Sequence, residues 1–202
     1  MPPLILPSKK LLVLDPCHGG KQPGAVAGNY KESAICRAIL SPLVDSILRD
    51  RKEFDVQTSF GLLNKPINST WLPNARRADL SNYTLNVQPI DFLLSIHLNA
   101  GDPSAKGMMV CYRTEANLQS ADYFYSAAIA YAESAGFDLA GNRDEKLQAR
   151  PSDLAILKVA PNSLLVEAAF LTNAGDRQLL LLRPDLYADA IKAGIYAVMN
   201  SL

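Results

Sequence analysis

The feature that most constrains the fold is a set of short, largely apolar runs, each of which stops at a polar side chain. Residues 11–14 end at Asp15, residues 91–96 run into His97, and residues 164–166 reach Glu167. Runs that are apolar on both faces are typical of parallel strands buried inside a sheet. In open α/β sheets, functional sites lie outside the carboxyl ends of the strands. The sequence therefore predicts a buried sheet with a site at one edge.

Helical and strand patterns alternate along the rest of the chain. Residues 61–75 have a loop composition, residues 138–153 show no clear period, and Pro42 is expected to kink or divide the first helix. The alternation predicts the α/β class: a single three-layer domain over residues 1–202, with its core at about 11–199 and a twisted, mostly parallel sheet covered by helices on both faces. Helices are expected at residues 31–48, 76–82, 121–134, 174–182 and 184–199, and further strands at 54–58 and 108–113.

The composition excludes several classes of protein. Lys and Arg together number 20, as do Asp and Glu, so the net charge is zero and there is no electrostatic footprint for nucleic acid. No apolar run approaches the roughly 20 residues that span a bilayer. The three cysteines are too few for a disulfide framework, and we expect Cys36 and Cys111 in the core. We expect a monomer without a membrane span.

The N-terminus does not have the order of a secretory signal. The short apolar stretch at residues 4–6 lies between prolines, and the lysines follow it rather than precede it. The localisation stays open, because the chain either leaves the cell by another route or has been trimmed.

The chain has only two histidines, and both lie beside predicted strand ends. His18 follows the first strand, His97 ends another, and Glu32 opens the helix after a glycine-containing loop. Two imidazoles and a carboxylate suit a zinc site that keeps its fourth position for water, and Glu167 would be a second carboxylate able to move protons. Spacing alone leaves open a purely structural alternative, in which the histidines form hydrogen bonds within the fold and Glu32 interacts favourably with the helix dipole.

Four short motifs add a resemblance to a known family. DPCHGG (15–20), KES (31–33), SIHLNA (95–100) and VEAAFLTN (166–173) occur in this order, and RADLSN (77–82) lies between them. Together they closely resemble the zinc-dependent N-acetylmuramoyl-L-alanine amidases of the type-3 amidase family, which cut peptidoglycan. The resemblance covers about residues 11–199.

The resemblance implies a fold, a site and a reaction. The fold would be a twisted six-stranded sheet with helices on both sides. His18, Glu32 and His97 would bind one Zn²⁺ per chain, and Glu167 would be the catalytic carboxylate. The substrate would be peptidoglycan, cut at the amide bond between N-acetylmuramic acid and the L-alanine of the stem peptide. A released lysis enzyme and an excised domain of a secreted amidase both fit this reading.

Cys17 departs from the family pattern, which usually has glycine directly before the first histidine. It would be a small buried side chain or a fourth zinc ligand, and a fourth ligand would close the position that catalysis needs. Other roles also stay open. Asp15 would orient His18 or bond within its own turn, Asn99 would bind substrate amides or shape a turn, and Arg77 would hold its helix against the sheet.

Two other functions compete with this reading. A zinc peptidase or amidohydrolase on a related sheet would use the same chemistry on a different substrate. A catalytically silent relative would bind peptidoglycan without cutting it, but such relatives typically lose a ligand or the catalytic Glu, and all four positions are present here.

Overall fold

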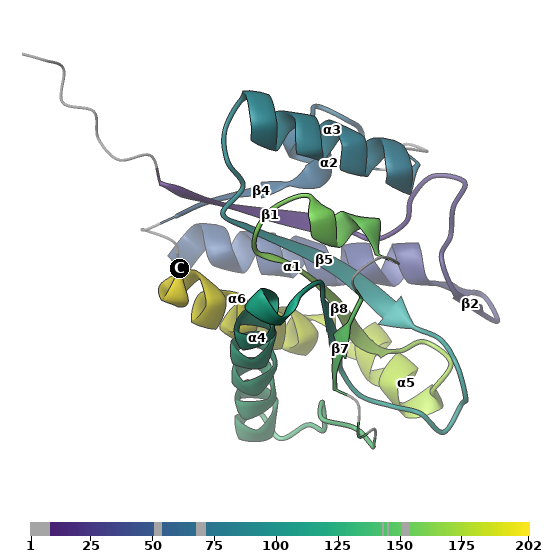
Figure 1. The fold of residues 1–202 in the computed structure, drawn as a ribbon. Coiled ribbons are helices and arrows are strands. Elements are labelled where there is room, and N and C mark those ends of the chain that lie inside the picture. Colours follow the sequence, from purple (N-terminus) through teal and green to yellow (C-terminus); the bar gives the residue numbers. More distant parts are fainter. Residues whose placement is uncertain (1–8, 51–53, 68–71, 143, 145, 151–153) are drawn as a thin grey trace, which may run out of the picture.

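A six-stranded sheet forms the centre of the molecule (Figure 1). The computed structural model describes residues 9–202 except 51–53, 68–71, 143, 145 and 151–153, so the apolar stretch at residues 4–6 lies outside the described residues. The strand order is β4-β1-β5-β8-β6-β7. The strands are β1 (Lys10–Pro16), β4 (Phe54–Thr58), β5 (Phe92–Asn99), β6 (Met109–Tyr112), β7 (Leu147–Ala149) and β8 (Ser163–Phe170).

The sheet is mostly parallel, as predicted. The strands β4, β1, β5 and β8 run parallel to one another, whereas β6 pairs antiparallel with β8 and parallel with β7. The parallel strands therefore bring their carboxyl ends to one edge. In the β5–β8 register, His97 lies directly opposite Glu167.

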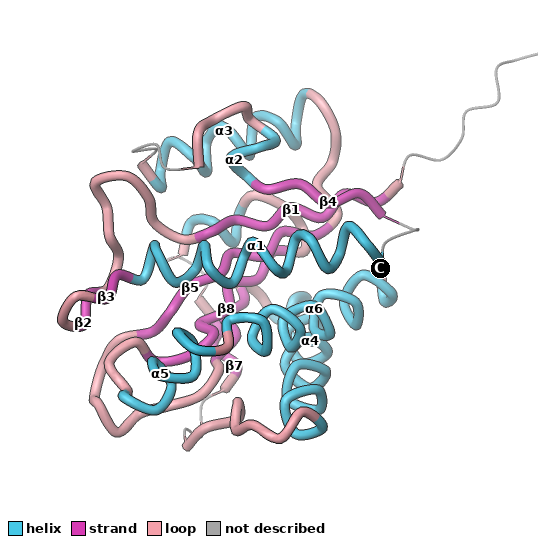
Figure 2. Tube along the Cα trace, turned by 180° about the vertical axis from the view of Figure 1, so that it is seen from behind, coloured by secondary structure: helices cyan, strands magenta, loops and turns pink. Residues whose placement is uncertain are grey.

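Helices cover both faces, which confirms the three-layer prediction (Figures 1 and 2). Alternate strand residues such as Leu12 and Val166 pack against α1, α4 and α6 in the main core, and Leu11 and Leu93 pack with Leu80 of α3 on the other face. The helices are α1 (Glu32–Asp50), α2 (Ser59–Leu62), α3 (Pro73–Asn86), α4 (Glu115–Ser134), the 3₁₀ helix η1 (Ala155–Lys158), α5 (Ala174–Leu182) and α6 (Pro184–Ser201).

Pro42 was expected to kink or divide the first helix, and the prediction that it divides the helix is wrong. α1 is one helix from Glu32 to Asp50. Proline lacks the N–H that would bond the carbonyl of Ala38 one turn earlier. Ala38 lies on the exposed face of the helix, where water can satisfy that carbonyl, while the opposite face is held by the core.

Other elements differ from the predictions at their bounds. α3 and α4 begin earlier than expected, and the short hairpin of β2 (Val26–Ala27) and β3 (Tyr30–Lys31) lies in the predicted loop. The strand β7 falls in the stretch without a clear period, because three residues at a sheet edge are too few to show one. Within the described residues, no helix has the length and apolar character needed to cross a bilayer.

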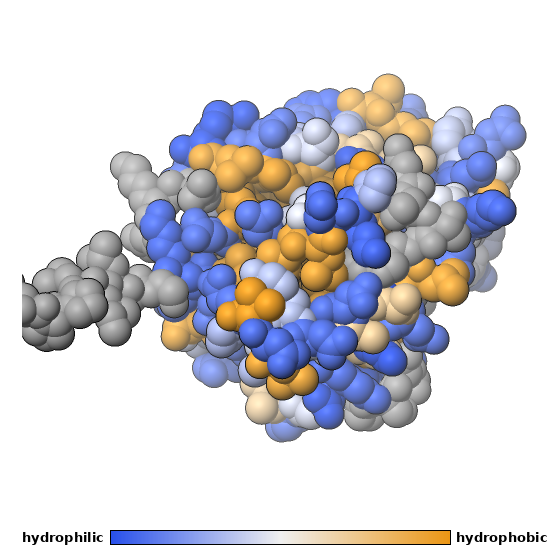
Figure 3. Space-filling view, turned by 90° about the horizontal axis from the view of Figure 1, so that it is seen from above, coloured by the Kyte–Doolittle hydropathy of each residue, from blue (hydrophilic) through white to orange (hydrophobic). Residues whose placement is uncertain are grey.

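The face that carries α3 is mixed in character (Figure 3). Seen from above, hydrophobic residues lie in separate groups divided by hydrophilic ones. Leu72, Leu85 and Val87, at the two ends of α3, are among the exposed hydrophobic residues.

Candidate metal centre

Three side chains from three different elements meet at the carboxyl edge of the sheet. His18 lies in the loop after β1, Glu32 is the first residue of α1, and His97 lies near the end of β5. His97 Nδ1 is 3.0 Å from Glu32 Oε1, and His18 Nε2 is 3.3 Å from Glu32 Oε2. One ligand atom from each residue lies within 4.8 Å of the others, which is close enough for all three to hold one metal ion.

Glu32 is the most tightly held of the three. Its Oε2 accepts a hydrogen bond of 2.8 Å from the backbone N–H of Ala25, and its Oε1 accepts one of 3.1 Å from Leu98. Burial alone would raise the pKa of this carboxyl, but the hydrogen bonds from His18 and His97 outweigh it and hold the pKa well below its usual range. Glu32 is therefore an ionised, oriented carboxylate.

The loop between β1 and α1 is shaped by Gly24. It has a φ of +73°, and a Cβ built there would overlap Glu32 Oε2 and His18 Cδ2. Only glycine lets the backbone pass so close to these two side chains. The sequence shows Gly24 only as part of a glycine-containing loop, and nothing in it shows that this residue packs against the candidate ligands.

Arg37 connects the same loop to α1. Its guanidinium donates a hydrogen bond of 2.7 Å to the carbonyl of His18 and another of 2.6 Å to the carbonyl of Ser33. The backbone of His18 is thereby tied to the helix that carries Glu32. Sequence reasoning missed this role, because an arginine inside an amphipathic helix usually faces solvent.

Asp15 forms a buried polar cluster below the loop. Its carboxylate accepts hydrogen bonds from Ser59, Arg76 and Ser95, at 2.6, 3.2 and 3.0 Å. None of the described hydrogen bonds of Asp15 reaches His18, so these contacts do not support the orienting role. Asp15 instead fixes the end of β1 against its neighbours.

Arg76, rather than the neighbouring Arg77, anchors α3 to the sheet. Arg76 is 3 % exposed, whereas Arg77 is half-buried. The guanidinium of Arg76 also donates hydrogen bonds to the carbonyls of Pro16 and Cys17, at 2.9 and 3.2 Å, and so holds the backbone just before His18. The RADLSN motif predicted the helix correctly, but it could not show which of two adjacent arginines faces inward.

Asn99 forms local contacts beyond the end of the site. Its Oδ1 accepts the N–H of Ala100 at 2.8 Å, and its Nδ2 lies 3.2 Å from Met109 Sδ. These bonds agree with the turn role.

Glu167 stands beside His97 across the β5–β8 pair. Its Oε2 is buried and has no hydrogen-bond partner among the described residues. Burial raises the pKa of this carboxyl to about 7. The electrostatic interaction with His97 opposes this rise, whereas the negative charge of Glu32 adds to it. A carboxyl with such a pKa can both take up and release a proton near neutral pH.

A cavity of about 210 Å³ opens beside these groups. It lies over the carboxyl edge of the sheet, between the start of α3 and η1. Its lining includes His18, His97, Arg76, Leu165 and Ile156, so its surface is largely apolar with a few polar groups. Cavities of this composition are typical of ligand sites.

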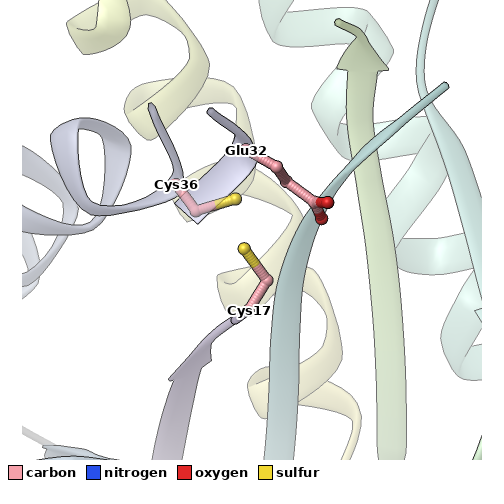
Figure 4. Close-up of side chains that lie close together, drawn as sticks. All are labelled: Cys17, Glu32 and Cys36. Atoms are coloured by element: carbon pink, nitrogen blue, oxygen red, sulfur yellow. The ribbon is translucent and has the colours of Figure 1, made fainter. Parts of the chain in front are cut away.

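A second group of side chains shares Glu32 (Figure 4). Cys17 and Cys36 point their sulfur atoms toward one another, while the carboxylate of Glu32 points away from both. All three residues are buried, and one ligand atom from each lies within 4.8 Å of the others. Because both oxygens of Glu32 are bonded on the histidine side, this group does not converge on a common centre as the first one does.

Replacing Cys17 by Gly is expected to keep the metal. The loss of a small buried side chain should cost roughly 1–2 kcal/mol of stability. The thiol of Cys17 faces Cys36, and the carboxylate of Glu32 points away from both. The metal content, measured by elemental analysis under reducing conditions, should therefore not change. A variant that folds but has lost its metal would show that Cys17 belongs among the ligands.

The fold and the site together define a class: an α/β domain with a candidate metal centre at the carboxyl edge of its sheet. The sequence profile of N-acetylmuramoyl-L-alanine amidases matches residues 12–197, and the chain belongs to this family. The family that the motifs predicted is thereby confirmed. A comparison with curated protein sequences gives no significant match.

Solved structures of this family share the fold at low sequence identity. An N-acetylmuramoyl-L-alanine amidase from Clostridium difficile is 22% identical, with a TM-score of 0.76 over 96% of this chain and 98% of the other. Ami1 from Mycobacterium smegmatis is 20% identical, with a TM-score of 0.76 over 96% and 99%. The CwlD amidase from Clostridioides difficile, solved in complex with the GerS lipoprotein, is 22% identical, with a TM-score of 0.75 over 96% and 100%.

Proposed function

We propose that this chain is a zinc-dependent hydrolase that cuts the amide bond between N-acetylmuramic acid and the L-alanine of the peptidoglycan stem peptide. The observation that carries the proposal is the meeting of His18, Glu32 and His97 at one point. Beside them lies Glu167 Oε2, which has no hydrogen-bond partner among the described residues. Membership of the amidase family supports the choice of substrate.

The donor set fits one zinc ion with an open position. Two imidazole nitrogens and a carboxylate oxygen are a set of three ligands that catalytic zinc uses, and they leave a fourth position for water or substrate. The backbone bonds from Ala25 and Leu98 orient the Glu32 carboxylate, and outer contacts of this kind fix a ligand in the geometry that a metal needs.

The residues of the chain divide the work of hydrolysis. Zinc, when bound, lowers the pKa of a coordinated water toward about 7 and polarises the carbonyl of the scissile amide. Glu167 takes a proton from the attacking water as the oxygen bonds to the carbonyl carbon. It then gives a proton to the alanine nitrogen as the C–N bond breaks, which turns a poor leaving group into an amine.

The raised pKa of Glu167 suits both steps. A carboxyl with a pKa of about 7 is basic enough to accept the proton and acidic enough to return it. The adjoining cavity would receive the part of the muramoyl-peptide next to the scissile bond.

The two competing functions remain distinguishable. A zinc peptidase would release amino acids from free peptides, whereas an amidase would release stem peptides from purified peptidoglycan. A silent relative would bind the wall polymer without releasing either. The presence of all four site residues in one cluster favours an active enzyme. That the chain acts as a monomer stays a prediction.

One zinc per chain is the expected result of elemental analysis of the purified protein. Replacing His97 by Ala should remove the metal, because two ligands hold zinc far less tightly than three. Chelation should abolish stem-peptide release, and added zinc should restore it. Wild-type protein that contains no metal and digests peptidoglycan fully in the presence of a chelator would refute the proposal.

A further inference from the structure

Two of the three cysteines form a pair that the proposed reaction does not use. Cys17 directly precedes His18, and Cys36 lies one helical turn after Glu32. Cys17 is 1% exposed and Cys36 is fully buried, and their sulfur atoms face each other (Figure 4). The third cysteine, Cys111, packs in a separate group with Leu157 and Leu165. All three are free thiols in the structure.

The surroundings of the pair favour a covalent bond over a second metal site. A soft metal ion held by both sulfur atoms would need further ligands or a linear arrangement, and among the described residues the carboxylate that groups with both sulfur atoms is that of Glu32. Both oxygens of Glu32 are already bonded to backbone N–H groups and to the histidines. The two sulfur atoms are thus left with each other as their nearest reactive partners within the described residues.

We propose that Cys17 and Cys36 form a disulfide when the chain folds in the presence of a disulfide oxidant, and that this bond fastens the His18 loop to helix α1. The odd number of cysteines is consistent with one pair and one thiol, Cys111. The setting in which the bond matters rests on the proposed function: peptidoglycan lies outside the cytoplasmic membrane, where disulfides form and persist.

The chemistry is a thiol–disulfide exchange in two steps. With oxidised glutathione as the oxidant, one cysteine thiolate attacks a glutathione sulfur and releases one reduced glutathione. The second cysteine thiolate then attacks the mixed disulfide and releases the other. Two protein thiols are oxidised to one S–S bond, the S–S bond of the oxidant is reduced, and the two thiol protons end on glutathione.

Burial places this reaction in the folding process. In the folded, reduced protein both sulfur atoms are closed off from an oxidant in solution. The bond would close a loop from residue 17 to residue 36, which holds Gly24, the β2–β3 hairpin and Glu32. Closing such a loop lowers the entropy of the unfolded chain and so raises stability.

Refolding the reduced, denatured full chain tests the proposal. One sample refolds with a mixture of oxidised and reduced glutathione and another with dithiothreitol, and free thiols are then alkylated. Trypsin places each cysteine on its own peptide, at residues 11–21, 32–37 and 107–113. The oxidised sample should contain the 11–21 peptide linked to the 32–37 peptide, with Cys111 alkylated. Its Tm should be roughly 5–10 °C above that of the reduced sample.

Three variants sharpen the result. Cys36→Ala and Cys17→Ser should both lose the Tm difference between oxidised and reduced samples, and the two together guard against a single variant that fails to fold. Cys111→Ser is the matched control, since Cys111 is also buried, and it should keep both the linked peptides and the Tm difference.

Several outcomes would overturn the proposal. Cys17 and Cys36 could remain alkylatable after oxidative refolding, or Cys111 could be linked to either of them. A second equivalent of zinc that disappears in Cys36→Ala would show a metal site in place of the disulfide. The linkage is read without metal or activity, so an inactive protein with an intact Cys17–Cys36 bond would count against the proposed function alone.

Discussion

Replacing Glu167 by Gln should lower the release of stem peptides from peptidoglycan by roughly two to four orders of magnitude, the range for the loss of a general acid–base group. The zinc content and the fold should not change. Gln has the same shape as Glu and can still hydrogen-bond to water, but it cannot take up the proton of the attacking water. It also cannot protonate the departing nitrogen.

The position of Glu167 allows this substitution to remove proton transfer without disturbing the fold. The residue lies inside β8, opposite His97, so its side chain is held by the sheet rather than by a loop. Its Oε2 has no hydrogen-bond partner among the described residues, so the amide of Gln breaks no bond there. Because Oε2 is the buried oxygen and forms no bond among the described residues, replacing the carboxylate by an amide should leave the Tm nearly unchanged.

Turnover, zinc content and Tm together distinguish the three roles that Glu167 could have. A structural carboxylate predicts a lower Tm, and a metal ligand predicts loss of zinc. Glu133→Gln, on the exposed side of α4, is the matched control and should behave like wild type. Near wild-type turnover by a Glu167→Gln protein that keeps its zinc and its Tm would rule out the catalytic role.

Gly24→Ala is expected to have the second large effect, a loss of metal affinity by roughly one to two orders of magnitude. A Cβ at this position would overlap both Glu32 and His18. The new methyl group must push one of the two side chains aside or move the loop that carries His18. Either shift spoils a geometry that tolerates little displacement.

Gly28→Ala provides a matched control for the backbone contribution. Gly28 lies in the same loop with a φ of +61°, and a Cβ there would meet no atom within 4 Å. Alanine at either position must adopt a left-handed backbone conformation, which lowers the free energy of unfolding by about 1–2 kcal/mol. Only the substitution at position 24 adds the collision with the candidate ligands.

Zinc titration of the two metal-free variants, with Tm measured alongside, checks this prediction. Both variants should lose a similar amount of stability, and only Gly24→Ala should bind zinc more weakly. Equal zinc affinities for the two variants would mean that the loop adjusts freely, and that the close contact at Gly24 does not position His18 and Glu32.

The sequence by itself determined the class of fold and pointed to the residues of the candidate site. Continuous apolar runs at residues 11–14 and 164–166 are typical of strands buried on both faces, and such strands need helices on both sides of the sheet. The polar residues that end these runs had to share an edge, because parallel strands align their carboxyl ends. With only two histidines in the chain, a zinc site with imidazole ligands had few alternatives.

The tertiary structure alone decided how these residues are held. Gly24, Arg37 and Arg76 position the His18 loop through contacts with residues that are distant in sequence or on another element, and no local pattern encodes such contacts. The short edge strand β7 and the antiparallel pairing of β6 also depend on neighbours supplied by the fold. The continuous helix through Pro42 follows the same rule, since packing against the core outweighs the local cost of a missing hydrogen bond. The periodicity of apolar residues indicates which face of a helix or strand is buried. Close contacts between side chains and the pairing of strands depend on segments that only the folded chain brings together.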